Sequence, residues 1–166
     1  NNTVYVAGQI GNYAMLYTNY DGISQPSTLL SAANSVFVKD NNVYAAGEEV
    51  SSGIGKAKIW KNGSATTIFQ DNTRMTSVFV TDKNVFAVGE TGTNGAFGIF
   101  NATLWKDNIP SLLSQKRSLA NSVFATATDV YVVGWEDANA NGTSAKAILW
   151  KNGILQVLSN NYSIAN

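Results

Sequence analysis

Asn34-Ser-Val-Phe-Val38 and Asn42-Val-Tyr-Ala-Ala-Gly47 are two neighbouring apolar segments that the chain repeats. The first segment returns as Thr76-Ser-Val-Phe-Val80 and Asn121-Ser-Val-Phe-Ala125. The second returns as Asn84-Val-Phe-Ala-Val-Gly89 and Asp129-Val-Tyr-Val-Val-Gly134. Segments rich in Val, Phe and Tyr and bounded by Asn, Asp and Gly are typical of β-strands. The repeat therefore predicts a pair of strands, here called A and B, joined by a tight turn.

Each pair is followed by a variable polar stretch and then by a segment that contains tryptophan. These segments are Lys58-Ile-Trp-Lys-Asn-Gly63, Thr103-Leu-Trp-Lys-Asp-Asn108 and Ile148-Leu-Trp-Lys-Asn-Gly153. The Asn-Gly pairs favour a type I′ hairpin, because both central residues of that turn adopt positive φ. A strand C with the tryptophan and a short strand D after the turn are therefore expected. The expected D strands are Thr28–Leu30, Thr67–Phe69, Ser111–Leu113 and Gln156–Leu158.

The tryptophans Trp60, Trp105 and Trp150 lie 45 residues apart. Repeats of about 40–45 residues with four strands each are typical of propeller blades. Over nearly its whole length the chain thus resembles the β-propeller repeat proteins. The resemblance implies an all-β, four-bladed propeller with four antiparallel strands per blade, in one domain over residues 1–166. The expected blades are residues 1–30 with 161–166, 34–70, 76–114 and 121–159.

The resemblance concerns architecture and not a functional family. The Gly-His and Trp-Asp pairs of WD40 repeats are absent, and the paired glycines of kelch repeats are reduced to single residues. No functional residue is carried over from either family.

The two terminal segments resemble two halves of one hairpin. Asn1–Gly8 matches strand B, and Met15–Tyr17 matches strand C with Tyr17 in the tryptophan position. Tyr162–Asn166 matches strand A. If the C-terminal strand completes the first blade, no sheet edge remains exposed. This arrangement favours a monomer. An eight-bladed ring of two chains, in which each C-terminal strand completes the partner's first blade, is the alternative.

The composition excludes several classes of site and partner. The chain has 11 basic and 11 acidic residues, and charged residues make up 13% of it. Nucleic-acid and anionic-membrane surfaces require clustered Lys and Arg, so neither is an expected partner. The chain contains no His and no Cys, which excludes disulfides, His- or Cys-based metal sites and His-based triads. No apolar run reaches the roughly 20 residues that span a bilayer, so no membrane insertion is expected. Low charge and abundant Asn and Thr favour an extracellular or cell-surface location.

The polar stretches between strands B and C are the expected ligand-binding loops. They are Gln9–Tyr13, Glu48–Lys56, Glu90–Asn101 and Trp135–Lys146. Carboxylates follow the strand-B glycine at Glu48, Glu90 and, one position later, Glu136. They favour a ligand with hydroxyls or positive charge, although a repeat also copies its solvated surface residues. As a pair they would suit a hydrolase only at about 5–9.5 Å separation, which the sequence does not place.

Aromatic residues outside the repeat pattern are candidate platforms for a sugar ring. Trp135 lies next to Glu136, so stacking and hydrogen bonding to one sugar are available side by side. Tyr13 lies in the corresponding stretch of the first blade. Burial of Trp135 against the neighbouring blade is the alternative. Trp60, Trp105 and Trp150 recur at one strand position and are instead expected to pack between blades.

Asp137-Ala-Asn-Ala-Asn-Gly142 matches the first half of a Ca²⁺-binding loop, with oxygen ligands at Asp137, Asn139 and Asn141. The twelfth position of that motif requires a bidentate Glu, and Ile148 stands there. We therefore expect no metal site. No cofactor is expected either, apart from an ion in the axial channel, where the serines aligned at the start of strand A would lie (Ser35, Ser77, Ser122 and Ser163).

The leading hypothesis is a non-catalytic recognition module that binds a glycan or a protein segment on the face of the B–C loops. The alternatives are a structural or interaction unit of a larger surface protein and a carboxylate-dependent hydrolase.

Overall fold

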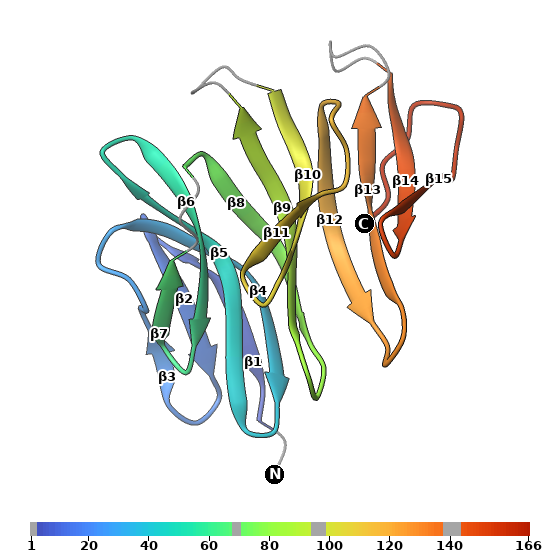
Figure 1. Cartoon of the computed structure of the whole chain (residues 1–166). Coiled ribbons are helices and arrows are strands. Elements are labelled where there is room, and N and C mark those ends of the chain that lie inside the picture. The colour runs from blue at the N-terminus through green and yellow to red at the C-terminus, as the bar shows by residue number, and fades with distance from the viewer. Residues whose placement is uncertain (1–2, 68–70, 94–98, 138–143) are drawn as a thin grey trace.

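The computed structural model describes residues 3–67, 71–93, 99–137 and 144–166. All of its regular elements are β-strands, in four antiparallel sheets whose strands follow one another in chain order (Figure 1). The fold is thus all-β and fits a four-bladed propeller, and no sheet closes on itself in the described part. The first sheet contains β1 (Tyr5–Ile10), β2 (Tyr13–Thr18) and β3 (Gly22–Ser24).

The other three sheets have four strands each. The second contains β4 (Leu30–Lys39), β5 (Asn42–Ser51), β6 (Ile54–Lys61) and β7 (Ser64–Thr67). The third contains β8 (Thr73–Val80), β9 (Val85–Thr93), β10 (Ile99–Lys106) and β11 (Ile109–Leu112). The fourth contains β12 (Ser118–Ala125), β13 (Val130–Asp137), β14 (Ala145–Lys151) and β15 (Ile154–Val157). Successive sheets pack against one another, so that the first and fourth lie at opposite ends of the row (Figure 1).

The hairpin turns have the predicted geometry. Asn62 and Gly63 have φ of 50° and 80°, and Asn152 and Gly153 have φ of 52° and 79°. The side chain of Asn62 also accepts a hydrogen bond from the amide of Val43 at 2.8 Å, which ties the turn to the start of strand β5. Each Asn therefore supplies both the unusual backbone conformation and a contact that fixes the hairpin to its sheet.

Strand D of the first sheet lies earlier in the chain than predicted. It is β3 at Gly22–Ser24, which pairs with β2 directly after the turn. Gly22 has φ of 74°, so the chain reverses there and the strand pairs at once. The expected strand Thr28–Leu30 instead leads into β4, which begins at Leu30.

The three tryptophans lie between sheets as predicted, each with 0% of its surface exposed. Trp105 packs in one cluster with Tyr44, Ile59 and Val78, which come from the second and third sheets. Trp150 packs in the corresponding cluster between the third and fourth sheets. The repeated tryptophan is therefore the centre of each interface between sheets.

A bulge in strand A explains the glycine that follows strand B. The register of β8 on β9 shifts between Met75 and Ser77. A Cβ atom at Gly89 would consequently lie 1.9 Å from the carbonyl oxygen of Arg74. Gly47 and Gly134 meet the corresponding carbonyl of their own first strands at 1.9 and 2.0 Å. Only glycine allows the two backbones to come this close.

The C-terminal segment lies against the fourth sheet, as the start of each strand A lies against the sheet before it. The amide of Ser163 donates to the carbonyl of Ala145 at 3.0 Å, and its hydroxyl accepts from the amide of Ala147 at 3.0 Å. The hydroxyl of Ser118 accepts in the same way from the amide of Ala102 at 2.8 Å. Ser163-Ile-Ala-Asn166 therefore corresponds to Ser118-Leu-Ala-Asn121, the start of a strand A, and not to the segment at Ser122.

Candidate functional site

In the part of the chain that the structure describes, strands extend into the predicted B–C loops. Strand β5 continues through Glu48 to Ser51, and β6 begins at Ile54, so only a two-residue turn at Ser52-Gly53 separates them. Both strands extend because β5 keeps pairing with β4 on one side and β6 on the other. The candidate residues consequently stand on strands at one end of the sheets.

The residues Glu48, Glu90 and Trp135 hold the same position in successive sheets. Each directly follows its strand-B glycine and pairs with the same repeat position of strand A, which is Ala32, Arg74 and Leu119 in turn. Glu136 stands one position later. Tyr13 begins β2 in the first sheet, is 40% exposed and pairs with Ile10.

The structure brings Glu48 and Glu90 together around Arg74. A guanidinium nitrogen of Arg74 lies 3.0 Å from Oε1 of Glu90. Burial raises the pKa of both carboxyls, and the positive charge of Arg74 opposes that rise. The negative charge of Glu48 further raises the pKa of Glu90, so the two carboxyls interact.

This group lines a cleft of about 260 Å³ between the second and third sheets. Its walls carry carboxylate, guanidinium, amide and aromatic groups. The lining residues are Glu48, Val50, Gly53, Gly55, Asn72, Thr73, Arg74, Glu90 and Phe100. Within the described residues, Glu48 forms no hydrogen bond or close ion pair, whereas Glu90 is held by Arg74.

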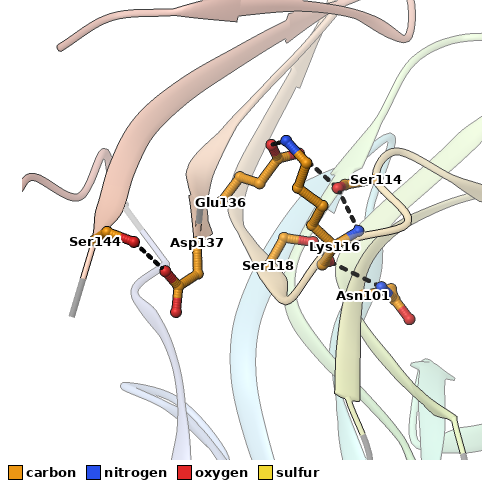
Figure 2. Close-up of polar contacts among 7 residues, drawn as sticks. All are labelled: Asn101, Ser114, Lys116, Ser118, Glu136, Asp137 and Ser144. Carbon is orange, nitrogen blue, oxygen red and sulfur yellow. Dashed lines mark hydrogen bonds and ion pairs between the residues drawn. The ribbon is translucent and has the colours of Figure 1, made fainter. Parts of the chain in front are cut away.

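The other two candidates, Trp135 and Glu136, belong to a separate cluster on the fourth sheet. The Glu136 carboxylate accepts hydrogen bonds from the Ser114 hydroxyl at 2.6 Å and the Lys116 ammonium at 2.8 Å (Figure 2). The bond to Glu136 raises the pKa of Lys116. The guanidinium of Arg117 lies 5.4 Å from the centre of the Trp135 ring, a cation–π contact. Glu136 and Trp135 are thus engaged by neighbouring side chains.

The carboxylate of Asp137 is buried and contacts protein groups. It accepts a hydrogen bond from the Ser144 hydroxyl at 2.7 Å (Figure 2). It also lies 3.7 Å from a guanidinium nitrogen of Arg117. The other two residues of the Ca²⁺-like motif, Asn139 and Asn141, lie outside the described residues. The described part contains no group of three or more acidic side chains suited to hold a metal ion.

Two of the serines assigned to an axial channel, Ser35 and Ser77, form hydrogen bonds between sheets. The hydroxyl of Ser35 accepts from the amide of Val78 at 3.2 Å, and that of Ser77 accepts from the amide of Val123 at 3.4 Å. Ser163 belongs to another position of the repeat, as described above. These hydroxyls therefore join neighbouring sheets.

Sequence reasoning missed Arg74, which completes the cleft together with Phe100, one of the aromatic residues outside the repeat pattern that were expected as candidate platforms. Arg74 belongs to the start of strand A, upstream of the repeated Ser-Val-Phe segment that was used to define that strand. The matching of Ser31, Thr73, Ser118 and Ser163 as one repeat position would have placed Arg74 opposite Glu90. Phe100 is the second residue of β10, at the position that Gly55 holds in β6.

No protein-family model matches this chain, and no curated protein matches it. A search of the described residues for a helix long and apolar enough to cross a membrane found none.

Proposed function

We propose that this protein is a non-catalytic recognition module that binds a glycan in the cleft between the second and third sheets. The observation that carries the proposal is the half-buried carboxyl of Glu48. It faces a cleft of about 260 Å³ and hydrogen-bonds to no other described residue.

A half-buried polar group without a protein partner favours a ligand that supplies one. A sugar hydroxyl donates to a carboxylate and also accepts from a guanidinium. Arg74, next to Glu48, carries such a guanidinium and is held in place by Glu90 at 3.0 Å. The cleft thus offers an acceptor and a donor side by side, with Asn72 adding both kinds of group.

Phe100 provides an apolar wall in the same cleft. The faces of pyranose rings are apolar C–H surfaces, and they pack on aromatic rings while the hydroxyls remain hydrogen-bonded at the ring edge. An aromatic wall beside a few convergent polar groups is the usual composition of a small-ligand site. This combination supports a glycan in preference to a protein segment.

A larger cleft of about 450 Å³ at the opposite end of the sheets is a weaker candidate. It is lined mainly by the turns between strands A and B. Two of its charged groups are already paired with each other, because the Lys39 ammonium lies 2.6 Å from the Asp82 carboxylate. A ligand that bound to either of these two groups would have to displace their ion pair.

A glycan-array screen with the labelled protein tests the proposal, followed by calorimetric titration of any glycan that binds. We expect Glu48→Ala and Phe100→Ala each to weaken binding by about tenfold or more, the loss of one to two good contacts. Glu49→Ala is the matched control. Glu49 is the next residue of β5, points to the other side of the strand and pairs with Lys58 at 2.7 Å, so binding should not change.

An array without any bound glycan would overturn the proposal and favour the structural or protein-binding alternatives. Equal losses in the Glu48 and Glu49 variants would show that the cleft is not the site. Hydrolysis of a bound glycan would contradict the non-catalytic part of the proposal.

A further inference from the structure

The two ends of the row of sheets carry complementary halves of the interface that the chain forms three times internally. At each internal interface, one sheet contributes a tryptophan from strand C that the preceding sheet buries. The first sheet has Tyr17 at this position, and 37% of its surface is exposed. The neighbouring Val6, which corresponds to the buried Ala45, Ala87 and Val132, is 43% exposed. Among the described residues, no sheet therefore covers this face of the first sheet.

The fourth sheet presents the opposite half. The phenylalanines of strand A form a row across the sheets, with 4.6 Å between the ring centres of Phe37 and Phe79 and 5.0 Å between those of Phe79 and Phe124. Phe79 packs in the cluster that Val130 joins from the next sheet. Phe124 has no such neighbour and is 53% exposed. The residue of the first sheet that corresponds to Val130 is Val4, which is itself 52% exposed.

The backbone at Gly8 is also not covered by a described strand A, unlike the backbone at the corresponding glycines. Its counterparts in the other sheets accommodate a strand-A carbonyl, as at Gly89, where a Cβ would lie 1.9 Å from the oxygen of Arg74. A Cβ at Gly8 would meet only the flexible end of Met15, at 3.1 Å. The carbonyl that corresponds to that of Arg74 in the next repeat belongs to Ile164. Ile164 lies in the segment seated on the fourth sheet.

We propose that the first sheet of one chain docks on the fourth sheet of a second copy, with Gly8 under the carbonyl of the partner's Ile164. The contact continues an interface already built three times in the chain, so its geometry is set by the repeat. Because it joins two different faces, two such contacts related by a two-fold axis close a ring of two chains. Because the first and fourth sheets of one chain lie at opposite ends of the row (Figure 1), a second copy is the occupant that fits the open face.

The absence of cysteine from the chain allows a direct test. Val4→Cys and Phe124→Cys place one thiol on each face, at positions that the repeat brings together. Two single-cysteine proteins, mixed and treated with a short bifunctional thiol reagent, can be linked only between copies. We expect a cross-linked dimer from this mixture. Val4→Cys mixed with Ile154→Cys, a position on the outer strand β15 that is 74% exposed, should give only background.

Gly8→Ala, added to the Val4→Cys chain, gives a second readout. Its Cβ should leave the fold of the separate chain intact and obstruct the docked carbonyl. We expect it to weaken association by about tenfold or more, measured as the concentration at which light scattering changes from one to two chain masses. The fold is checked independently by circular dichroism.

A chain that carries both cysteines tests whether the first and fourth sheets of one chain contact each other. A cross-link within one chain, with no dimer from the mixture, would overturn the proposal and show that the first and fourth sheets close on each other. No cross-link in either experiment, with one chain mass at all concentrations, would overturn it as well.

Discussion

Trp105 and Tyr17 occupy the same position of the repeat, yet one is fully buried and the other is 37% exposed. The difference lies in the neighbours and not in the strand. The second sheet packs over Trp105, whereas no described sheet packs over Tyr17 in the same way. The comparison teaches that a blade of this protein has little core of its own, and that its stability comes from the faces it shares with adjacent blades, as in other repeat architectures.

Truncation of the two aromatic residues should reveal this difference most strongly. Trp105→Ala should lower the free energy of unfolding by about 3–5 kcal/mol, the usual cost of removing a large buried ring. Tyr17→Ala should cost only about 1 kcal/mol when the protein is dilute enough to be monomeric. Urea denaturation followed by circular dichroism measures both. Similar losses in the two variants would contradict the exposed face of the first sheet.

Trp105→Phe sharpens the same comparison. The indole N–H of Trp105 is buried and has no hydrogen-bond partner in the described part of the chain. Phenylalanine removes this unsatisfied donor while retaining most of the apolar surface, so the loss should be well below that of the alanine variant.

Substitution of the glycine after strand B should also cost more stability in an internal sheet than in the first sheet. In Gly89→Ala the new Cβ meets the carbonyl of Arg74, and neither backbone can move away without breaking the β8–β9 pairing. We expect a loss of about 1–3 kcal/mol, typical of overpacking in a core. Gly8→Ala should change the stability of the separate chain by less than about 0.5 kcal/mol. Thermal unfolding of both variants at low concentration provides the measurement. A strong loss for Gly8→Ala would show that the first sheet is already covered within its own chain.

The repeat made the strands, the hairpin turns and the buried tryptophans predictable, because each depends on local residue chemistry. Asn62-Gly63 required a specific turn, and Trp60 recurred at one strand position. The sequence could not fix the end of the ring in the same way. Tyr162–Asn166 is too short to show its alignment through strand composition, and Ser163 was matched to Ser122 when its contacts match those of Ser118. The alignment with Ser122 placed the segment four residues away from its position in the repeat, which the hydrogen bond to the Ser163 hydroxyl defines.

The candidate site was predictable in part. Glu48 and Glu90 were found because they follow a repeated glycine. Their meeting around Arg74 was not predicted, because it depends on how the second and third sheets pack and on the bulge in β8. Trp135 and Glu136 carried equally suitable chemistry in the sequence. The packing of the fourth sheet instead pairs them with Arg117, Lys116 and Ser114.

Removal of one serine hydroxyl should lower stability more at an internal interface than at the end of the row, with a smaller difference than for the aromatic residues. The Ser118 hydroxyl is fully buried and accepts from the amide of Ala102 at 2.8 Å. Ser118→Ala leaves that amide without a partner and should cost about 1–3 kcal/mol. Ser163→Ala removes the same contact where water can replace it, so we expect less than about 1 kcal/mol. Hydrogen exchange at the amides of Ala102 and Ala147 would locate each effect. Equal costs would imply that the C-terminal segment is as deeply buried as β12.

The smallest expected effect concerns the pH dependence of the cleft. Burial raises the pKa of Glu48 in the folded chain above its ordinary value of 4.5. Below that value the carboxyl is protonated in both the folded and unfolded states, so burial carries no charge penalty. As pH rises through the folded pKa, the unfolded chain releases its proton more readily, and the folded state loses stability.

Glu48→Gln has no carboxyl to ionise and does not lose stability in this way. Its free energy of unfolding, relative to that of the native protein, should therefore rise between pH 4 and pH 7 by less than about 1 kcal/mol. Denaturation midpoints of both proteins at the two pH values measure the difference, and Glu49→Gln serves as the control because it removes the ion pair with Lys58 instead. A gain in the opposite direction would mean that the charged form of Glu48 is favoured in the cleft, where Arg74 would then outweigh burial.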